Sequence, residues 1–293
     1  MTSDFDPTDY DDHLLASLRE DAVDRDVTTN ALPEPERPVE GRVIARERGV
    51  LAGLPLFERV FELLPRVASH FKSDSLTVRP RAEDGDHVEP DESILELTGP
   101  AQSVLAGERV ALNYLQQLSG VASATQKLVD LADPHDVEVF DTRKTTPHHR
   151  PLQKYAVRQG GGHNHRMDLS EAVMVKDNHK ELAEGLRNYL EVLETEKPVI
   201  VEVHNVNELP ILEDFRASED FDIEIVMLDN FEPSDLKTVT LNLPDEWAAE
   251  VSGGITLDNV QAYCSTGVDR ISVGAVTHSF DSLDLSLKVT PSR

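Results

Sequence analysis

Basic residues gather in one stretch of an otherwise acidic chain. The 293-residue sequence has 28 Lys+Arg against 55 Asp+Glu, a formal net charge of −27. Between Asp141 and Lys180 the balance reverses, because eight cations stand against four acids, and five of the eleven histidines also lie there. Concentrated cations in a protein that repels anions elsewhere predict an anion-binding site.

Half of these cations lie at or after the ends of predicted strands. Arginine can grip both oxygens of a carboxylate, and lysine supplies a movable positive charge. We predict that these four residues hold a ligand with several negative charges, with His165 hydrogen-bonded to the same ligand. The four are Arg143, Lys144, Arg166 and Lys176. For the others in the stretch, surface ion pairs are at least as well supported: Arg150, Lys154, Arg158 and Lys180.

Two carboxylates end successive apolar runs. Glu202 ends Val-Ile-Val-Glu, and Asp229 ends Ile-Val-Met-Leu-Asp. Two oxygen donors together with water and a polyphosphate form a typical loose Mg²⁺ site, and the same pair can stabilise positive charge on a sugar. For Asp229, capping of the following helix is an alternative role.

Glycines follow the last two predicted strands. Ser252-Gly253-Gly254 and Gly274-Ala275 allow backbone N–H groups to approach an anion closely, so we predict that both loops bind phosphate. Gly160-Gly161-Gly162 lacks the Gly-x-Gly-x-x-Gly spacing of a dinucleotide site and is interpreted as a point of close backbone approach or a mobile loop.

The histidines of the basic stretch do not predict a transition-metal site. His148, His149, His163 and His165 have no partnering cysteine, and His-x-x-x-His spacing is absent.

A repeated pattern positions these residues. Short β-branched runs recur along the chain, and the residues that end the last five runs are 22–27 residues apart, the length of a strand, a helix and two loops. The runs are 137–140, 172–175, 199–201, 223–228, 249–251 and 270–273. We predict a parallel sheet closing into an incomplete, open α/β barrel with its reactive groups at the carboxyl ends of the strands, and an open doubly wound sheet is the competing arrangement.

The first part of the chain predicts a separate α/β sandwich-like domain. Residues 39–45 and 49–53 are predicted strands joined by a turn, 54–67 a helix, and one or two long helices follow Pro100. We place an N-terminal domain at 1–115, the barrel at 116–280 and a tail at 281–293 that packs back on the N-terminal domain.

Composition excludes several classes of protein. The acidic charge argues against nucleic-acid binding, no apolar run is long enough to span a membrane, and the first residues do not suggest a signal peptide. The single cysteine, Cys264, fits a reducing, cytoplasmic location. Acid spread along the whole chain also predicts a protein adapted to high salt.

Ordered motifs over essentially the whole chain resemble quinolinate phosphoribosyltransferase, also called carboxylating nicotinate-nucleotide pyrophosphorylase. They are Asp141-Thr-Arg-Lys-Thr-Thr-Pro, Gly160-Gly-Gly with Asn164-His-Arg, Lys176-Asp-Asn-His, Val201-Glu-Val, Leu228-Asp-Asn-Phe, Ser252-Gly-Gly-Ile and Gly267-Val-Asp-Arg-Ile-Ser-Val-Gly-Ala-Val-Thr-His-Ser. Glu20-Asp with Asp26-Val-Thr-Thr and Glu108-Arg109-Val-Ala-Leu-Asn extend the resemblance upstream.

The resemblance implies phosphoribosyl transfer from 5-phosphoribosyl-1-pyrophosphate to quinolinate with loss of CO₂, in a homodimer whose active sites lie at the subunit interface. Arg109 would reach into the partner's site. The implied quinolinate residues are Arg143, Lys144, His165, Arg166 and Lys176. Glu202 and Asp229 would lie near Mg²⁺ and the sugar, the two glycine loops would bind phosphate, and Lys144 would contact the carboxylate that is lost.

This sequence departs from the family pattern at four positions. His148 and His149 replace a usual Gly-Leu, His204 stands where an acid is common, and Glu171 replaces Asp. None of these is a residue with an assigned chemical role.

Two other functions remain open on the residues alone. A Schiff-base aldolase could use Lys176 at a strand end, and a non-catalytic paralogue could bind an anion for regulation. The acid pair argues against the paralogue, and the number of cations argues against an enzyme for nicotinate, which has one carboxylate. Assembly of dimers into larger oligomers is left open.

Overall fold

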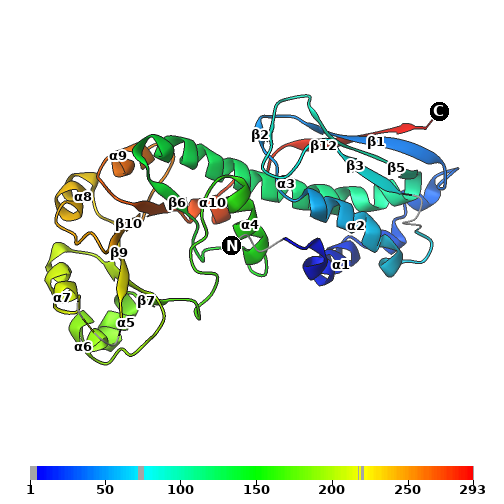
Figure 1. Cartoon of the computed structure of the whole chain (residues 1–293). Coiled ribbons are helices and arrows are strands. Elements are labelled where there is room, and N and C mark those ends of the chain that lie inside the picture. The colour runs from blue at the N-terminus through cyan, green and yellow to red at the C-terminus, as the bar shows by residue number, and fades with distance from the viewer. Residues whose placement is uncertain (1–4, 72–75, 217, 219–220, 293) are drawn as a thin grey trace. The chain divides into compact units, whose positions relative to one another are not determined.

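The structure, a computed structural model, describes residues 5–71, 76–216, 218 and 221–292. The chain divides into two compact units (Figure 1). The first contains the chain up to Ala124 together with the segment from Phe280, and the second contains Thr125–Ser279.

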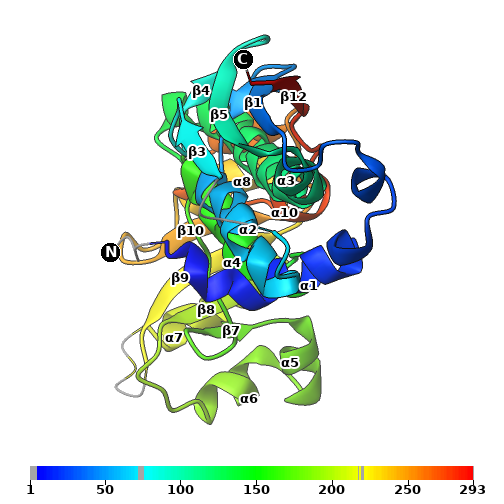
Figure 2. The same cartoon turned by 90° about the vertical axis from the view of Figure 1, so that its right-hand side faces the viewer.

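The first unit is built on an antiparallel sheet with the strand order β12-β1-β5-β3. The bounds are β1 Pro38–Ala45, β3 Thr77–Pro80, β5 Ser93–Pro100 and β12 Leu285–Pro291. Buried and exposed residues alternate along β1, as expected for a strand with one face on the core. Helices α2 (Leu54–Val67) and α3 (Ala101–Ala132) lie on the same side of this sheet (Figures 1 and 2).

Helix α2 has the predicted bounds. Pro55 stands in its first turn, where the missing N–H costs nothing, and the helix buries an apolar face that includes Phe57 and Phe61. Helix α1 (Asp11–Glu20) packs against it, and the guanidinium of Arg59 on α2 donates two hydrogen bonds of 2.8 Å to Asp11.

The two early predicted strands do not pair with each other, and the second is shorter than predicted. Strand β1 pairs with β5 and β12, whereas β2 (Gly49–Val50) pairs with β4 (His87–Val88) in a separate two-stranded sheet. The backbone after β2 turns to α3 instead: Val50 and Ala52 donate N–H bonds of 2.8 and 3.0 Å to the hydroxyls of Ser123 and Ser119. Buried serines on a helix therefore replace a strand partner.

The end of the chain is part of the first unit. Strand β12 pairs antiparallel with β1 from Val39↔Pro291 to Ala45↔Leu285. Gly120 of α3 allows this segment to approach, because a Cβ there would lie 2.3 Å from the carbonyl oxygen of Asp281.

The division between the units falls inside α3, between Ala124 and Thr125, rather than near Leu115. Helix α3 is continuous across this point. Its apolar periodicity therefore does not indicate where the helix stops packing on the first unit and starts packing on the second. No helix among the described residues has the length and apolarity needed to cross a membrane.

The second unit contains six parallel strands, each at one of the predicted runs. Their bounds are β6 Glu138–Phe140, β7 Val173–Val175, β8 Val199–Val203, β9 Ile223–Asp229, β10 Ala248–Ser252 and β11 Arg270–Ser272. The order is β6-β11-β10-β9-β8-β7, so the last strand pairs with the first, and β6 and β7 are the two edges. The prediction of an open α/β barrel is confirmed, with the opening between its first two strands.

Short helices follow the strands and lie on the outside of the curved sheet (Figure 1). They are α4 Arg150–Gln159, α5 Asp177–Leu182, α6 Leu186–Glu191, α7 Leu209–Asp214, α8 Pro233–Thr240, α9 Val260–Cys264 and α10 Ala275–His278. Apolar side chains from neighbouring strands, including Met174, Ile200 and Met227, form one core of this unit. The edge of β6 is partly covered by a single bridge from Phe140 to His163.

Candidate active site

A cavity of about 540 Å³ opens among the strand ends of the barrel unit. It is lined by Thr142, Arg143, Lys144, His165, Arg166, Met174, Lys176, Met227, Asp229, Ser252, Gly253, Gly254, Ile255, Thr256, Ser272, Val273, Gly274, Ala275 and His278. Every predicted site residue therefore lines one cavity, apart from Arg109 and Glu202.

Two arginines line this cavity with incompletely paired guanidinium groups. The Nε atoms of Arg143 and Arg166 are buried and have no hydrogen-bond partner. One nitrogen of Arg166 donates to the carbonyl of Ala172 at 2.7 Å. Burial, followed by the positive charge of Arg143, lowers the pKa of Arg166 from its ordinary value. Like charges held together with open donors are the arrangement expected for binding an anion.

Lys144 is exposed, and its backbone is fixed by the loop around it. Its N–H donates to the hydroxyl of Thr142 at 3.0 Å, and its carbonyl accepts from the hydroxyl of Thr277 at 2.8 Å. The side chain passes close to Gly274, where a Cβ would lie 3.1 Å from the lysine Cδ. One predicted phosphate loop and one predicted substrate cation are therefore neighbours.

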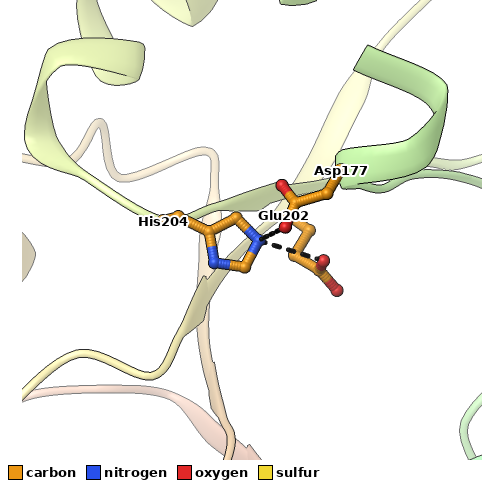
Figure 3. A group of neighbouring side chains, drawn as sticks. All are labelled: Asp177, Glu202 and His204. Carbon is orange, nitrogen blue, oxygen red and sulfur yellow. Dashed lines mark hydrogen bonds and ion pairs between the residues drawn. The ribbon is translucent and has the colours of Figure 1, made fainter. Parts of the chain in front are cut away.

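Lys176 and Glu202 form an ion pair. Glu202 is almost fully buried and lies behind Lys176 rather than on the wall of the cavity. The imidazole Nε2 of His204 is 3.2 Å from its second oxygen (Figure 3). Buried carboxylates need partners, and here both oxygens have one.

Asp229 is held by polar groups at the end of β9. It accepts a 2.5 Å hydrogen bond from the hydroxyl of Ser252 and a 2.6 Å bond from the amide of Asn230. Helix α8 begins at Pro233 with Glu232 as its N-cap residue, so the alternative role of Asp229 as a helix cap is wrong.

Two glycines of the predicted phosphate loops lie close to neighbouring side chains. Gly253 has φ +94°, and a Cβ there would lie 2.2 Å from the side-chain oxygen of Asn230. A Cβ on Gly274 would lie 3.0 Å from Nε2 of His278. Any larger residue would therefore fill the space that these loops leave beside the cavity.

A buried ion pair supports the substrate cations. Lys154 and Asp141 are both fully buried and paired. Asp141 also accepts from the His165 N–H at 2.9 Å and from the Asn164 amide at 2.7 Å, and the Lys154 ammonium donates to the His165 carbonyl at 2.8 Å. Burial raises the pKa of Asp141 and lowers that of Lys154, while their mutual attraction opposes both changes.

The remaining cations of the basic stretch are also structural. Arg150 donates to the carbonyl oxygens of Met167 and Arg143, Arg158 donates to Asn164, and buried Lys180 binds Glu208 at 2.7 Å. Neither these three cations nor Lys154 lines the cavity, but the alternative of surface ion pairs is wrong for Lys154, which is fully buried with Asp141.

Among the described residues, only one ring nitrogen of His165 has a hydrogen-bond partner. Nδ1 accepts the Arg166 N–H at 2.8 Å, and Nε2 lies 3.6 Å from a carboxylate oxygen of Glu250. Glu250 on β10 is fully buried, neither of its oxygens has a hydrogen-bond partner, and Arg270 is 3.9 Å away. Sequence analysis missed Glu250, whose only signal is an acid inside an apolar strand.

The other histidines give a mixed result. His278 lines the cavity and was not predicted as a site residue, although it belongs to the last family motif. His148 and His149 do not line it. Arg109 is an exposed residue of α3 in the first unit.

The fold and site together define an α/β-barrel enzyme acting on small anions, with a cationic pocket, an adjacent acid pair and glycine loops at the strand ends. The family model for the C-terminal domain of quinolinate phosphoribosyl transferase matches residues 121–288, and the model for its N-terminal domain matches residues 26–119. The chain belongs to the quinolinate phosphoribosyl transferase family.

Individual relatives agree along the length of the chain. A probable carboxylating nicotinate-nucleotide pyrophosphorylase from Bacillus subtilis is 37% identical, over 87% of this chain and 85% of the relative. A probable carboxylating nicotinate-nucleotide pyrophosphorylase from Methanocaldococcus jannaschii is 36% identical, over 94% of this chain and 95% of the relative. The crystal structure of NadC from Streptococcus pyogenes is 36% identical and superposes with a TM-score of 0.87, covering 100% of both chains.

Proposed function

We propose that this protein transfers the phosphoribosyl group of 5-phosphoribosyl-1-pyrophosphate to quinolinate with decarboxylation, giving nicotinate mononucleotide, pyrophosphate and CO₂ in the de novo synthesis of NAD. It is then a pentosyltransferase. The observation that carries this proposal is a pair of arginines, Arg143 and Arg166, whose buried Nε atoms have no hydrogen-bond partner, in a cavity of a protein with net charge −27.

Quinolinate suits the cationic side of the cavity. It carries two adjacent carboxylates on a pyridine ring, and Arg143 and Arg166 offer planar forks for them. Lys144 provides a further charge at the exposed edge. His165 lines the cavity, and its Nε2 has no hydrogen-bond partner among the described residues, so in this proposal Nε2 donates a hydrogen bond to quinolinate while Nδ1 accepts the Arg166 N–H.

The phosphoribosyl donor suits the glycine loops of the cavity. Phosphate groups would lie on the backbone N–H groups of Ser252-Gly253-Gly254 and Gly274-Ala275. Asp229 lines the same cavity and accepts a hydrogen bond from Ser252 of the first loop, so we expect it to contact the ribose.

Mg²⁺ would be held by Asp229 and Glu202 together with pyrophosphate oxygens and water. Their carboxylate oxygens are the donor type that Mg²⁺ prefers, and His204 bridges the two acids, with Nδ1 3.7 Å from Asp229. When bound, the ion supplies positive charge to the pyrophosphate group.

The residues of the chain would act in two stages. The pyridine nitrogen forms a bond to the anomeric carbon as the bond to pyrophosphate breaks, and Asp229 and Glu202 stabilise the positive charge that develops on the ribose. The positive charge of the pyridinium nitrogen then stabilises the electron pair that stays on C2 when the C2–carboxylate bond breaks, and a proton binds to that pair in place of CO₂. Positioning by Lys144 and Arg143 holds the carboxylate for this step.

The first experiment incubates the purified protein with Mg²⁺, phosphoribosyl pyrophosphate and either quinolinate or nicotinate, at several salt concentrations. We expect nicotinate mononucleotide and CO₂ from quinolinate only, with turnover lost when EDTA removes Mg²⁺ and recovered when Mg²⁺ is restored. Product from nicotinate would contradict the assignment of the second carboxylate site. Absence of product from a folded sample would favour the anion-binding paralogue, and an imine trapped by borohydride would favour the aldolase.

The active assembly we propose is a homodimer in the cytoplasm, with Arg109 of each subunit completing the site of the other. Arg109 is exposed on α3 and does not line the cavity described above, which supports a role toward another chain. Cys264 is buried and unpaired, in keeping with a reducing compartment.

High salt should stabilise this protein. The excess of 27 negative charges repels itself within the folded chain, and salt screens exposed charges more strongly as its concentration rises. We therefore expect the midpoint of thermal unfolding to rise steadily from low to molar KCl. Glycerol at matched osmolality, which does not screen charge, is the control. A midpoint that is insensitive to KCl would show that the acidic surface is not an adaptation to salt.

A further inference from the structure

Three side chains of the barrel unit converge at one imidazole nitrogen (Figure 3). Nε2 of His204 lies 2.8 Å from Oδ2 of Asp177 and 3.2 Å from Oε1 of Glu202. Asp177 opens α5, Glu202 is on β8, and His204 follows that strand, so secondary structure fixes two of the three. We call these three residues the His204 cluster.

We propose that the His204 cluster binds a divalent transition-metal ion of the Zn²⁺ type. The donor set is one imidazole nitrogen and two carboxylate oxygens, with water completing the coordination. This is a donor set that Zn²⁺ accepts, and with three protein ligands it leaves one position open.

The spacing of the donor atoms suits such an ion. The three donors lie within 4.8 Å of one another. Bonds of about 2.0–2.2 Å in a tetrahedron place neighbouring ligand atoms about 3.3 Å apart. The Nε2 distances of 2.8 and 3.2 Å are close to that edge, so only small side-chain adjustments are needed to admit the ion.

The other oxygen of each carboxylate is already held by a lysine. Lys176 pairs with Oε2 of Glu202, and Lys180 lies 3.3 Å from Oδ1 of Asp177. Each acid therefore directs its remaining oxygen toward His204 without losing its lysine contact. Carboxylates oriented in this way resemble the hydrogen-bonded ligands of metal sites.

The second nitrogen of His204 also has a carboxylate beside it. Nδ1 is 3.7 Å from Oδ2 of Asp229. A carboxylate next to the non-ligating nitrogen is the usual outer contact of a metal-bound histidine, because it fixes the tautomer and makes the ligand more basic. A small movement of the Asp229 carboxylate toward Nδ1 of His204 would form this hydrogen bond.

Formal charge around the cluster matches a dication. Four carboxylates and two ammonium groups are within ion-pair reach of one another, which leaves two negative charges when His204 is neutral. These are Asp177, Glu202, Glu208 and Asp229 with Lys176 and Lys180. A Zn²⁺ ion would balance them.

This site is distinct from the Mg²⁺ site of the proposed function, although the two share Glu202. Mg²⁺ requires near-octahedral oxygen coordination and would come with the pyrophosphate, whereas the His204 cluster offers nitrogen and needs no substrate. An acid at position 204 would provide oxygen only, so histidine specifically favours the later transition metals.

The test measures Co²⁺ and Zn²⁺ binding to the metal-free, substrate-free protein, so failure of the proposed reaction would not affect it. Calorimetry should show one Zn²⁺ site per chain, and Co²⁺ should give the intense visible absorption of four-coordinate cobalt, abolished by Zn²⁺ and retained in excess Mg²⁺. His204→Asn and Asp177→Asn should each weaken Zn²⁺ binding at least tenfold. His204→Glu should restore binding of Mn²⁺ more than binding of Zn²⁺.

His163→Asn is the matched control, because His163 is an exposed histidine of the same unit whose nearest acid, Glu138, is 3.9 Å away. It should bind Zn²⁺ as the parent does. Unfolding midpoints establish that each variant is folded. The proposal is overturned if Zn²⁺ binding is equally strong in His204→Asn and the parent, if no saturable site is found, or if Mg²⁺ displaces Co²⁺ completely.

Discussion

Arg143→Ala should lower kcat/KM for quinolinate by a factor on the order of 100 or more. A charge-assisted hydrogen bond contributes about 1.5–3 kcal/mol, and a two-pronged contact from a partly buried guanidinium loses two of them. About 3 kcal/mol in the transition state corresponds to roughly a hundredfold change in rate constant. Steady-state kinetics with quinolinate varied at saturating phosphoribosyl pyrophosphate measures it.

The same substitution should leave the folded state intact. Nε of Arg143 has no hydrogen-bond partner, and its charge lowers the pKa of neighbouring Arg166, so removing it relieves a repulsion. We expect the unfolding midpoint of the ligand-free variant to equal or exceed that of the parent. Functional sites typically contain residues that lower the stability of the ligand-free protein but are needed for ligand binding.

Two variants sharpen the experiment. Arg143→Lys keeps the charge but loses the fork, and should recover only part of the activity. Arg187→Ala removes an exposed arginine of the same unit, paired with Asp214, and should keep parental kinetics. If Arg143→Ala lowers kcat/KM for quinolinate by less than about threefold, Arg143 does not bind quinolinate.

Lys154→Met should destabilise the protein by about 3–5 kcal/mol, the cost of leaving a buried carboxylate without its partner. Asp141 is fully buried, and its other hydrogen bonds, to the His165 N–H and the Asn164 amide, do not neutralise its charge. The free energy of unfolding, from denaturant titration at fixed molar KCl, measures the loss. Because Lys154 also holds the His165 carbonyl, KM for quinolinate should rise in the same variant.

A double-mutant cycle isolates the ion pair. Asp141→Asn combined with Lys154→Met removes both charges, so the double variant should lose clearly less stability than the sum of the single variants. Lys127→Ala, an exposed position on α3 in the same unit, should change stability by no more than about 0.5 kcal/mol. Strict additivity in the cycle would mean that the two groups do not depend on each other.

Local patterns made the barrel predictable from the sequence. Runs of β-branched residues form strands because their side chains pack on a pleated surface, and a polar residue marks each strand end. The rule that reactive groups gather at the carboxyl ends of parallel strands then brought Arg143, Lys176 and Asp229 to one edge, and they line one cavity.

Relations between distant segments were not predictable in the same way. The His204 cluster depends on the packing of α5 beside β8, where Lys180 donates to the Glu202 carbonyl, and the motif that contains Asp177 does not indicate that its side chain meets His204. Glu250 and His165 approach only because one loop folds into the barrel. The division of the chain inside α3 depends on packing on either side of an uninterrupted helix.

The placement of β12 has a consequence for synthesis on the ribosome. Strands β1 and β5 are complete once Pro100 has emerged, but the strand that covers the other edge of β1 begins only at Leu285. At translation rates of 5–20 residues per second, that edge stays open for roughly ten to forty seconds. An open edge can accept the same strand from another nascent chain, so swapping of the C-terminal strand between neighbouring chains is the misassembly that this topology invites.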